Sequence, residues 1–332
     1  MVGDKLQSIL RSPLLLVLTI PLSLLYGLVI ALRNLFYDLG IFKIRHVSIP
    51  VISVGNISTG GSGKTILVQA IARLFLENNT RPAILSRGYG RNTSGLQIVS
   101  DGVNVMGSVD ASGDEPYMMA LNLPGVPVVV SENRVNGANY IHENFTVDVI
   151  LLDDGFQHRR LHRDLNILLE DNSGFVVSHL LPWGDLRESS KAKRRADLIL
   201  KSKSPVQDES DSELRIFSSK TAFDLEGNAV HSDVLKDGFG VFSGLGNNEH
   251  FIRSTEDSFG PPTMVVSLPD HTAYSENDLQ GIPLEECPAW ITSQKDIIKL
   301  DQQLCSTHNI LYLRVDCELP EMLLAGLKNY FK

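Results

Sequence analysis

The stretch PVISVGNISTGGSGKT, residues 50–65, decides how the chain is expected to fold. Residues 50–54 form a short apolar run typical of a buried strand, and the chain after the stretch carries the periodicity of a helix. Between them, Gly60, Gly61 and Gly63 let the backbone turn its N–H groups toward an anion without Cβ clashes. A strand, a glycine-rich turn and a helix in this order predict a phosphate-binding loop.

This loop predicts a nucleotide site with defined roles. Lys64 would reach the β- and γ-phosphates, and the hydroxyl of Thr65 would bind Mg²⁺. Ser58 stands where the usual motif has a glycine, so the loop is a variant. A glycine-rich turn that binds nothing is the alternative, but Gly-Lys-Thr at a strand–helix junction favours the nucleotide. We expect the phosphates to be held by Ser58, Thr59, Gly60, Gly61, Ser62, Gly63, Lys64 and Thr65.

A second apolar run, residues 148–152, ends in Asp153 and Asp154. A carboxylate at the carboxyl end of a strand beside the phosphate loop is where a magnesium partner is expected. Asp-Gly pairs also make ordinary turns. The two adjacent acids favour the metal site over the turn.

Two further acidic motifs are less specific. Asp114 and Glu115 precede a helical stretch, and an acidic first turn would explain them equally well. Asp270 and His271 follow an apolar run, and a single histidine is more often structural than catalytic. Periodicity alone does not bring these residues together.

The N-terminus is apolar and uncharged from Ser12 to Leu32. As a helix, about twenty such residues reach roughly 30 Å, the hydrocarbon thickness of a bilayer. The sequence Ala31-Leu32-Arg33 lacks the cleavage site of a signal peptide. A buried core helix is possible, and Pro21 and Gly27 weaken a simple spanning helix. We expect membrane embedding. Basic residues flank both ends, so spanning and interfacial arrangements both stay open.

Composition describes a globular protein of 332 residues with a formal net charge of −9. This charge argues against broad electrostatic binding of nucleic acid, which usually leaves a basic footprint. The three cysteines form neither a metal-like pair nor a disulfide framework.

The rest of the chain alternates apolar runs with amphipathic segments, which predicts an α/β protein with a parallel sheet and flanking helices. Helices are expected over 65–77, 133–143, 293–307 and 319–330, and 201–213 is expected to be a linker or an exposed hairpin. The predicted strands are 50–54, 83–86, 126–130, 148–152, 165–169 and 198–200, then 239–242, 264–268, 290–292 and 311–315. The later group indicates a second, smaller α/β domain, with ligands bound in a cleft between the two.

Taken together, the motifs resemble the tetraacyldisaccharide 4′-kinases, the lipid A 4′-kinases of Gram-negative bacteria. The resemblance covers nearly the whole chain and rests on motifs in a fixed order. Besides the leucine-rich N-terminus and the phosphate loop, these are Ser86-Arg87-Gly88-Tyr89-Gly90, Gly113-Asp114-Glu115-Pro116, Asp153-Asp154-Gly155-Phe156-Gln157-His158, Leu186-Arg187-Glu188 and Asp270-His271.

The resemblance implies a P-loop NTPase-like fold and transfer of the γ-phosphate of ATP, with Mg²⁺, to the 4′-hydroxyl of a tetraacylated glucosamine disaccharide 1-phosphate. The product would be lipid IVA in lipid A biosynthesis.

The resemblance also implies roles for single residues. Asp114 would accept the proton of the sugar hydroxyl with His271 as its partner, and Arg187 would stabilise the transferring phosphate. Metal ligands would be Thr65 and Asp153, with Glu115 and Asp154 as second ones. Substrate contacts would be Tyr89, Gln157, His158 and Glu188. Apart from the resemblance, a cluster of basic residues offers cations for a lipid 1-phosphate or anionic headgroups, although a solvated charged helix face would explain most of them: Arg159, Arg160, Arg163, Lys191, Lys193, Arg194 and Arg195.

The expected organisation is a membrane-associated helix over 1–34, a P-loop kinase domain over 35–205 and a smaller domain over 206–332 that closes the active-site cleft. The partners would be the lipid-linked disaccharide and the membrane surface, with no nucleic acid and no obligate protein partner. The location would be the cytoplasmic face of the bacterial inner membrane. Two rival functions stay open: a membrane-attached ATPase switch, and a P-loop kinase of another acceptor.

Overall fold

The computed structural model describes residues 13–173, 176–202, 211–246, 248–270 and 272–332. It divides into two compact units. The larger unit runs through Ile216 and resumes over Cys317–Lys332, and the smaller unit is Phe217–Asp316. Within the described residues, the chain therefore passes between the units at two points.

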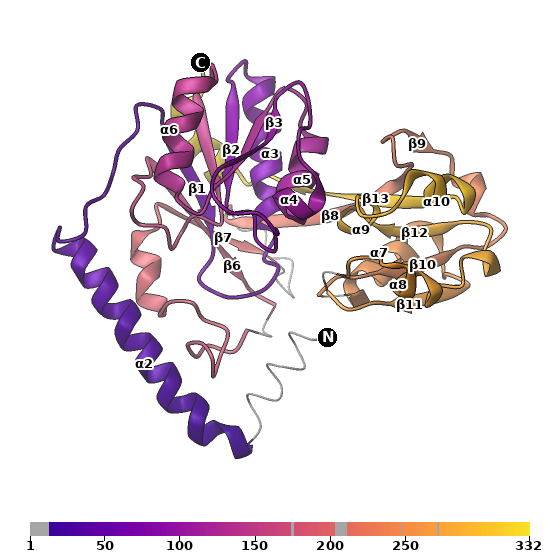
Figure 1. Ribbon diagram of the computed structural model, residues 1–332, viewed down its shortest axis with the longest axis horizontal. Coiled ribbons are helices and arrows are strands. Elements are labelled where there is room, and N and C mark those ends of the chain that lie inside the picture. Colours follow the sequence, from indigo (N-terminus) through magenta and orange to yellow (C-terminus); the bar gives the residue numbers. More distant parts are fainter. Residues whose placement is uncertain (1–12, 174–175, 203–210, 247, 271) are drawn as a thin grey trace. The chain divides into compact units, whose positions relative to one another are not determined.

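The larger unit is built on a mostly parallel sheet (Figure 1). The strand order is β7-β6-β1-β5-β2-β4-β3, and the first residues of β8 pair with β7. Only β3 runs antiparallel to its neighbour. The strands are β1 (Val51–Gly55), β2 (Pro82–Ser86), β3 (Gln97–Asp101), β4 (Pro127–Val130), β5 (Val149–Asp153), β6 (Leu165–Asp171), β7 (Leu198–Ser202) and β8 (Glu213–Phe223). Every residue of β1, β2 and β5 is buried, as expected of parallel strands covered on both faces.

Helices cover both faces of this sheet. Successive side chains of a strand point to opposite faces, so Ile52 packs on one side while Val51 packs on the other. The first side is covered by α3 (Lys64–Glu77), α5 (Asp114–Asn122) and α11 (Glu321–Leu327), and the second by α6 (Arg134–Asn144). The short helices α4 (Val109–Ser112), η1 (Ser190–Arg195) and η4 (Lys328–Tyr330) complete the unit. This is the predicted P-loop-type arrangement.

The N-terminal segment forms one long helix, α2 (Pro13–Asp38), which belongs to the larger unit. Over Leu16–Asp38 it is long and apolar enough to cross a membrane, by length and composition only. Only 11% of its apolar window is buried, so it is not a core helix of the unit. The apolar surface continues beyond the helix with Leu39, Ile41, Phe42 and Ile44, all exposed.

The smaller unit has its own sheet, in the order β11-β10-β12-β13-β8, with β9 beside β8. The strands are β9 (Ala229–Val230), β10 (Gly240–Ser243), β11 (Met264–Ser267), β12 (Trp290–Ser293) and β13 (Ile310–Glu318). Its helices are η2 (Ser232–Leu235), α7 (Asn248–Phe259), α8 (Glu276–Gln280), η3 (Leu284–Glu286), α9 (Gln294–Ile297) and α10 (Gln302–Thr307). Trp290 lies so close to Gly240 that a Cβ on this glycine would come within 2.4 Å of the indole ring.

Three predictions of secondary structure were wrong or incomplete. The single helix expected over 293–307 is divided into α9 and α10, because Asp301 accepts hydrogen bonds from Gln303 N and Leu304 N and starts a new helix. The strands β3 and β8 were not predicted. Of the expected linker 201–213, residues 203–210 lie outside the described part, and its ends belong to β7 and β8.

Candidate active site

The phosphate loop begins where β1 ends and is fixed by hydrogen bonds from three directions. Thr59 N donates to the carbonyl of Asp185 at 2.7 Å. Asn56 Nδ2 donates to Ser62 Oγ at 3.1 Å, and Ser202 Oγ donates to the carbonyl of Ser62 at 3.0 Å. Gly60 and Gly61 at the tip are exposed. The loop is therefore held at its base while its tip stays open to a ligand.

Gly63 caps the start of α3 in the left-handed conformation, with φ of 89°. Glycine is favoured there because other residues rarely adopt this backbone, and a Cβ would come within 2.3 Å of Ile216 Cδ1. Lys64 and Thr65 follow as the first residues of a 14-residue helix. The N–H groups and dipole of such a helix favour a phosphate at this end.

Asp153 ends β5 beside the loop, since β1 and β5 pair with Val54 opposite Asp153. The carboxylate is 1% exposed and accepts a hydrogen bond from Ser86 Oγ at 3.1 Å. Burial, then the neighbouring Glu115 and Asp154, raise the pKa of Asp153 to about 7. A nearby cation would stabilise the charged form of this buried carboxylate.

Asp154 brings together the two cations of the site. Lys64 Nζ lies 3.7 Å from Asp154 Oδ1. Arg187 Nη1 donates to both carboxylate oxygens, at 3.0 and 2.8 Å. Burial raises the pKa of Asp154, but Lys64 and Arg187 outweigh burial and lower it below its ordinary value. The residue also has a left-handed backbone, with φ of 49°, which is uncommon outside glycine.

These acids suit Mg²⁺ better than a metal that needs a complete protein cage. Among the described residues, no group of three or more His, Cys, Asp or Glu converges to hold a metal ion. Mg²⁺ is usually bound by one or two carboxylates together with phosphates and water. Asp153 Oδ1 is buried and has no hydrogen-bond partner in the described part, and the hydroxyl of Thr65 stands at the start of α3. The donor set is all oxygen, as Mg²⁺ requires.

Asp114 and Glu115 are the first two residues of α5, after Gly113 at φ of 90°. Glu115 is exposed and close enough to Asp153 to raise its pKa, whereas Asp114 is half-buried. Asp270 belongs to the smaller unit, where Lys295 Nζ lies 3.8 Å from its carboxylate. His271 lies outside the described residues. The pairing of Asp114 with His271 therefore stays a prediction.

The four predicted substrate residues lie in different surroundings. Tyr89 is 75% exposed, while Gln157 donates to the carbonyl of Asn56 at 2.7 Å. Burial, then nearby arginines led by Arg134, lower the pKa of His158 to about 4, so its imidazole is neutral at pH 7.

Glu188 is 1% exposed, and its two carboxylate oxygens are used inside the unit. Arg195 Nη2 donates to one oxygen at 2.9 Å and Asn34 Nδ2 to the other at 2.7 Å. Glu188 therefore holds α2 and η1 together. Its contact with substrate stays a prediction.

Most of the predicted cations for a lipid phosphate already have partners. Arg159 bonds Asp38, Arg195 bonds Glu188 and Lys193 contacts Glu170. Arg163 donates to the carbonyl of Phe156 at 3.1 Å, and burial lowers its pKa to about 10. Among these predicted cations with a described ion pair, Arg194 has the most exposed side chain, at 75%.

The sequence prediction gave no role to Ser86 or Arg134. Ser86 ends β2 and bonds Asp153. Arg134 is 4% exposed and starts α6, and burial, then Arg87, lower its pKa to about 10 despite the nearby Asp153 and Asp154. A signal for Ser86 existed, because polar residues at the carboxyl ends of neighbouring parallel strands meet at one edge. Arg134 carried no comparable signal, since it lies in the first turn of a helix and not at the carboxyl end of a strand.

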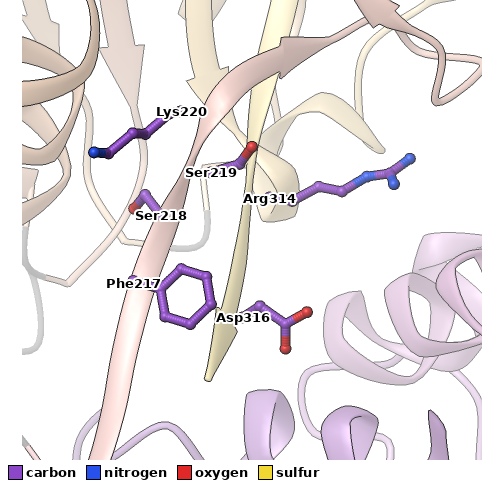
Figure 2. A pocket seen from close by; sticks show the side chains of 6 residues that line it. All are labelled: Phe217, Ser218, Ser219, Lys220, Arg314 and Asp316. Carbon is purple, nitrogen blue, oxygen red and sulfur yellow. The ribbon is translucent and has the colours of Figure 1, made fainter. Parts of the chain in front are cut away.

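Each unit contains a cavity lined by described residues. One, of about 660 Å³ in the larger unit, is lined by α2, the phosphate loop and residues 169–193, and includes Ser58. The other, of about 540 Å³ in the smaller unit, is lined by side chains of the neighbouring strands β8 and β13 and contains no predicted site residue (Figure 2).

A family model described as "LpxK: Tetraacyldisaccharide-1-P 4′-kinase" matches residues 15–332. A protein of Aquifex aeolicus named tetraacyldisaccharide 4′-kinase is 41% identical over 302 residues, which is 88% of this chain and 90% of that protein. A protein of the same name from Pelobacter propionicus is 37% identical over 337 residues, 95% of this chain and 92% of that protein.

A crystal structure of LpxK from Aquifex aeolicus in complex with ATP has a similar fold. Its TM-score is 0.80 at 38% sequence identity, and the match covers 98% of this chain and 100% of that chain. The similarity therefore extends over both units and includes an ATP-binding relative.

Proposed function

The chain belongs to the tetraacyldisaccharide-1-P 4′-kinase family, and from that premise we propose how its residues carry out the reaction. It is an ATP-dependent kinase that transfers the γ-phosphate to the 4′-hydroxyl of a tetraacylated glucosamine disaccharide 1-phosphate, giving lipid IVA in lipid A biosynthesis. Its cofactors are ATP and Mg²⁺. The observation that carries this assignment is the convergence of Lys64 and Arg187 on Asp154 beside the phosphate loop.

In this proposal the loop from Ser58 to Thr65 holds the ATP phosphates, and Lys64 neutralises the β- and γ-phosphates. Lys64 and Arg187 now share one carboxylate, Asp154. A bound γ-phosphate offers them a second anion. Phosphoryl transfer depends mainly on positioning and on such charge neutralisation. Arg187 is the cation best placed to follow the phosphate as it moves.

Thr65 and Asp153 are the proposed metal ligands, with Asp154 and Glu115 as further ones. Mg²⁺ held by these residues would offset the negative charge of the ATP phosphates. Ser86 holds one oxygen of Asp153 and leaves the other, Oδ1, without a protein partner in the described part.

Asp114 is the proposed acceptor of the proton from the sugar hydroxyl, and His271 is its proposed partner. The helix α5 supports this by presenting Asp114 in its first turn, beside Glu115, which faces Asp153. Tyr89, Gln157, His158 and Glu188 remain the proposed contacts of the disaccharide. The proposed organisation is the helix over 1–34, the kinase domain over 35–205 and a domain over 206–332 that closes the cleft and brings His271 to the substrate.

We propose that α2 lies in the membrane interface and does not span the bilayer. One side of α2 is hydrogen-bonded to the larger unit from Ser23 to Asp38. A spanning helix would need about 20 residues in hydrocarbon, away from a globular unit whose polar groups require water or partners. The opposite side exposes Leu18, Leu22 and Leu25 along with other apolar residues, which suits the boundary between headgroups and acyl chains.

The proposed location is the cytoplasmic face of the bacterial inner membrane, where ATP is available. Deleting residues 1–32 tests the attachment. The truncated protein should move to the soluble fraction and act poorly on acceptor in vesicles. A truncated protein that sedimented with vesicles like the full chain would place the attachment elsewhere.

The main rival is an ATPase switch that needs a phosphate loop but no acceptor. The decisive assay uses ATP labelled on its γ-phosphate, with and without the lipid disaccharide in vesicles. We expect turnover only with the acceptor and the label on the lipid. Turnover that is independent of the acceptor, with the label in inorganic phosphate, would favour the switch. Transfer to another alcohol in preference to the lipid would favour a different kinase.

A further inference from the structure

The side of α2 that faces the larger unit is polar at regular helical spacing. Thr19 is 2% exposed and Ser23 is 5% exposed, and Tyr26 and Asn34 continue the same side of the helix. Gly27 lies on this side too, where a Cβ would come within 2.7 Å of Leu180 Cδ1. An anchor needs only an apolar outer side, so a close-fitting inner side with specific polar contacts calls for a second role.

Three hydrogen bonds from this side end on one short segment, residues 180–188, while others join α2 to Gln157, Arg159 and Arg195. Ser23 Oγ donates to the carbonyl of Leu180 at 2.7 Å, and Tyr26 Oη donates to the carbonyl of Arg187 at 2.8 Å. Asn34 Nδ2 donates to Glu188 at 2.7 Å. Burial, then the nearby Glu188, raise the pKa of Tyr26, so its hydroxyl keeps the proton that it donates.

The same segment is bonded to the phosphate loop on its other edge. Arg187 N donates to the carbonyl of Ile57 at 2.7 Å, and Thr59 N donates to the carbonyl of Asp185 at 2.7 Å. Between these contacts, Ser58 and Leu186 form an isolated antiparallel β-bridge. The backbone of Arg187 is thus fixed at its N–H by the loop and at its carbonyl by α2. Its guanidinium reaches Asp154 from this fixed backbone.

We propose that Tyr26 is a positioning residue for Arg187, so that α2 sets the catalytic arginine as well as holding the protein at the membrane. This inference rests on the proposed function, in which Arg187 stabilises the transferring phosphate. The physical reason is that misplacing a charge by about 1 Å can cost up to about a hundredfold in rate. Tyr26 acts only through Arg187 and touches no reacting atom.

The test is Tyr26→Phe, which keeps the ring and removes the hydroxyl. Tyr37→Phe is the matched control, because the Tyr37 ring packs under Arg33 and Arg159 while its hydroxyl makes no hydrogen bond to the described residues. We expect single-turnover transfer in Tyr26→Phe to fall about tenfold. The KM for ATP and the sedimentation with phosphatidylethanolamine–phosphatidylglycerol vesicles should stay within about twofold of wild type. Tyr37→Phe should behave like wild type.

Coupling to Arg187 is tested in a double-variant cycle. If Tyr26 acts through Arg187, then Tyr26→Phe should cost less than about twofold in an Arg187→Ala background. The same tenfold loss in both backgrounds, a parallel loss of vesicle binding, or a wild-type rate in Tyr26→Phe would each overturn the inference.

The cycle also separates this inference from the proposed function. If the wild-type protein moved no phosphate to the lipid, or Arg187→Ala kept the wild-type rate, the proposed function would fail and the inference with it. If Arg187→Ala were slow and Tyr26→Phe were not, only the inference would be rejected.

Discussion

Lys64, Arg187 and Asp154 form a small charge cluster beside the phosphate loop. Without phosphate, Asp154 is the shared anion of both cations, and its pKa is lowered by them. The side chain of Lys64 is 12% exposed and that of Arg187 is 29% exposed, so both charges are partly shielded from water. Electrostatic interactions strengthen in such a site. The cluster therefore keeps two cations ordered before the substrate arrives.

Replacing Lys64 tests this cluster. Lys64→Ala should lower single-turnover transfer by about 10²–10³, the usual cost of removing one preorganised group that stabilises developing charge. The fold should persist, because Arg187 still neutralises Asp154. Lys328→Ala, which changes an exposed lysine of the same unit, is the control. Wild-type transfer in Lys64→Ala would contradict the assignment of the phosphate loop.

Where a local motif defined them, the sequence singled out residues that the fold brings close together, and their roles stay predictions. Lys64, Thr65, Asp153 and Asp154 follow from a strand, a turn and a residue type that stand together in the chain. The partner of Glu188 could not be predicted in this way, because Asn34 lies 154 residues away. Only the folded chain shows that this carboxylate is buried.

At the scale of whole elements, periodicity was a good guide to buried strands and a poor one to exposed strands. β1, β2 and β5 are apolar throughout because both faces of the sheet are covered. β8 was missed because its burial follows no regular alternation: Leu214 and Ala222 are buried, whereas the apolar Phe217 is exposed. It also begins in one unit and ends in the other. Its pattern follows from its neighbours in the fold, which the sequence does not display.

The contact between β2, β5 and the C-terminus gives a prediction about pH. Asp148, just before β5, accepts two side-chain hydrogen bonds from Arg81, just before β2, and forms an ion pair with Lys332. The Arg81 hydrogen bond, against the effect of burial and with help from Lys332, lowers the pKa of Asp148 well below its usual range. A carboxylate with a lowered pKa stabilises the fold above its unfolded pKa of about 3.9, and this stabilisation is lost as the pH falls below that value.

Asp148→Asn should therefore lower the melting temperature at pH 7 by a few degrees, for a loss of about 1 kcal/mol. The difference from wild type should shrink as the pH falls below about 4, because Asp148 then takes up a proton in the unfolded chain while its carboxylate in the folded protein, with the lower pKa, stays charged. Glu143→Gln, an exposed carboxylate on α6, is the control and should differ little from wild type at any pH. A difference that did not change with pH would show that the ion pair is not its source. Thermal unfolding followed by circular dichroism measures both variants.

At the scale of the whole molecule, the proposed chemistry needs both units. Asp114 belongs to the larger unit, while Asp270 and the position of His271 belong to the smaller one. The two chain crossings, at residues 216–217 and 316–317, leave each unit with its own sheet and core. The pairing of Asp114 with His271 stays a prediction that only a functional test decides.

This joint action is tested by combining two variants. Asp114→Asn should slow transfer by about 10²–10⁴, the usual contribution of a general base, while ATP affinity changes far less. His271→Ala should be slow too, and the double variant should lose less than the product of the two single losses, as expected of groups that act as a unit. If the double variant lost as much single-turnover rate as the product of the two single losses at every pH, Asp114 and His271 would not act as a pair. Normal turnover in Asp114→Asn would shift the role of base to Asp153 or Asp154.

The position of the transferred phosphate tests the account most directly. The tetraacylated disaccharide 1-phosphate, or its 4′-deoxy analogue, would be incubated with the full-length protein, ATP and Mg²⁺ in vesicles, and the products followed by ³¹P NMR and mass spectrometry. The account predicts one new phosphate, attached at the 4′ oxygen, and no phosphorylated product from the 4′-deoxy analogue. A phosphate on another hydroxyl, or equal phosphorylation of the 4′-deoxy analogue, would contradict it.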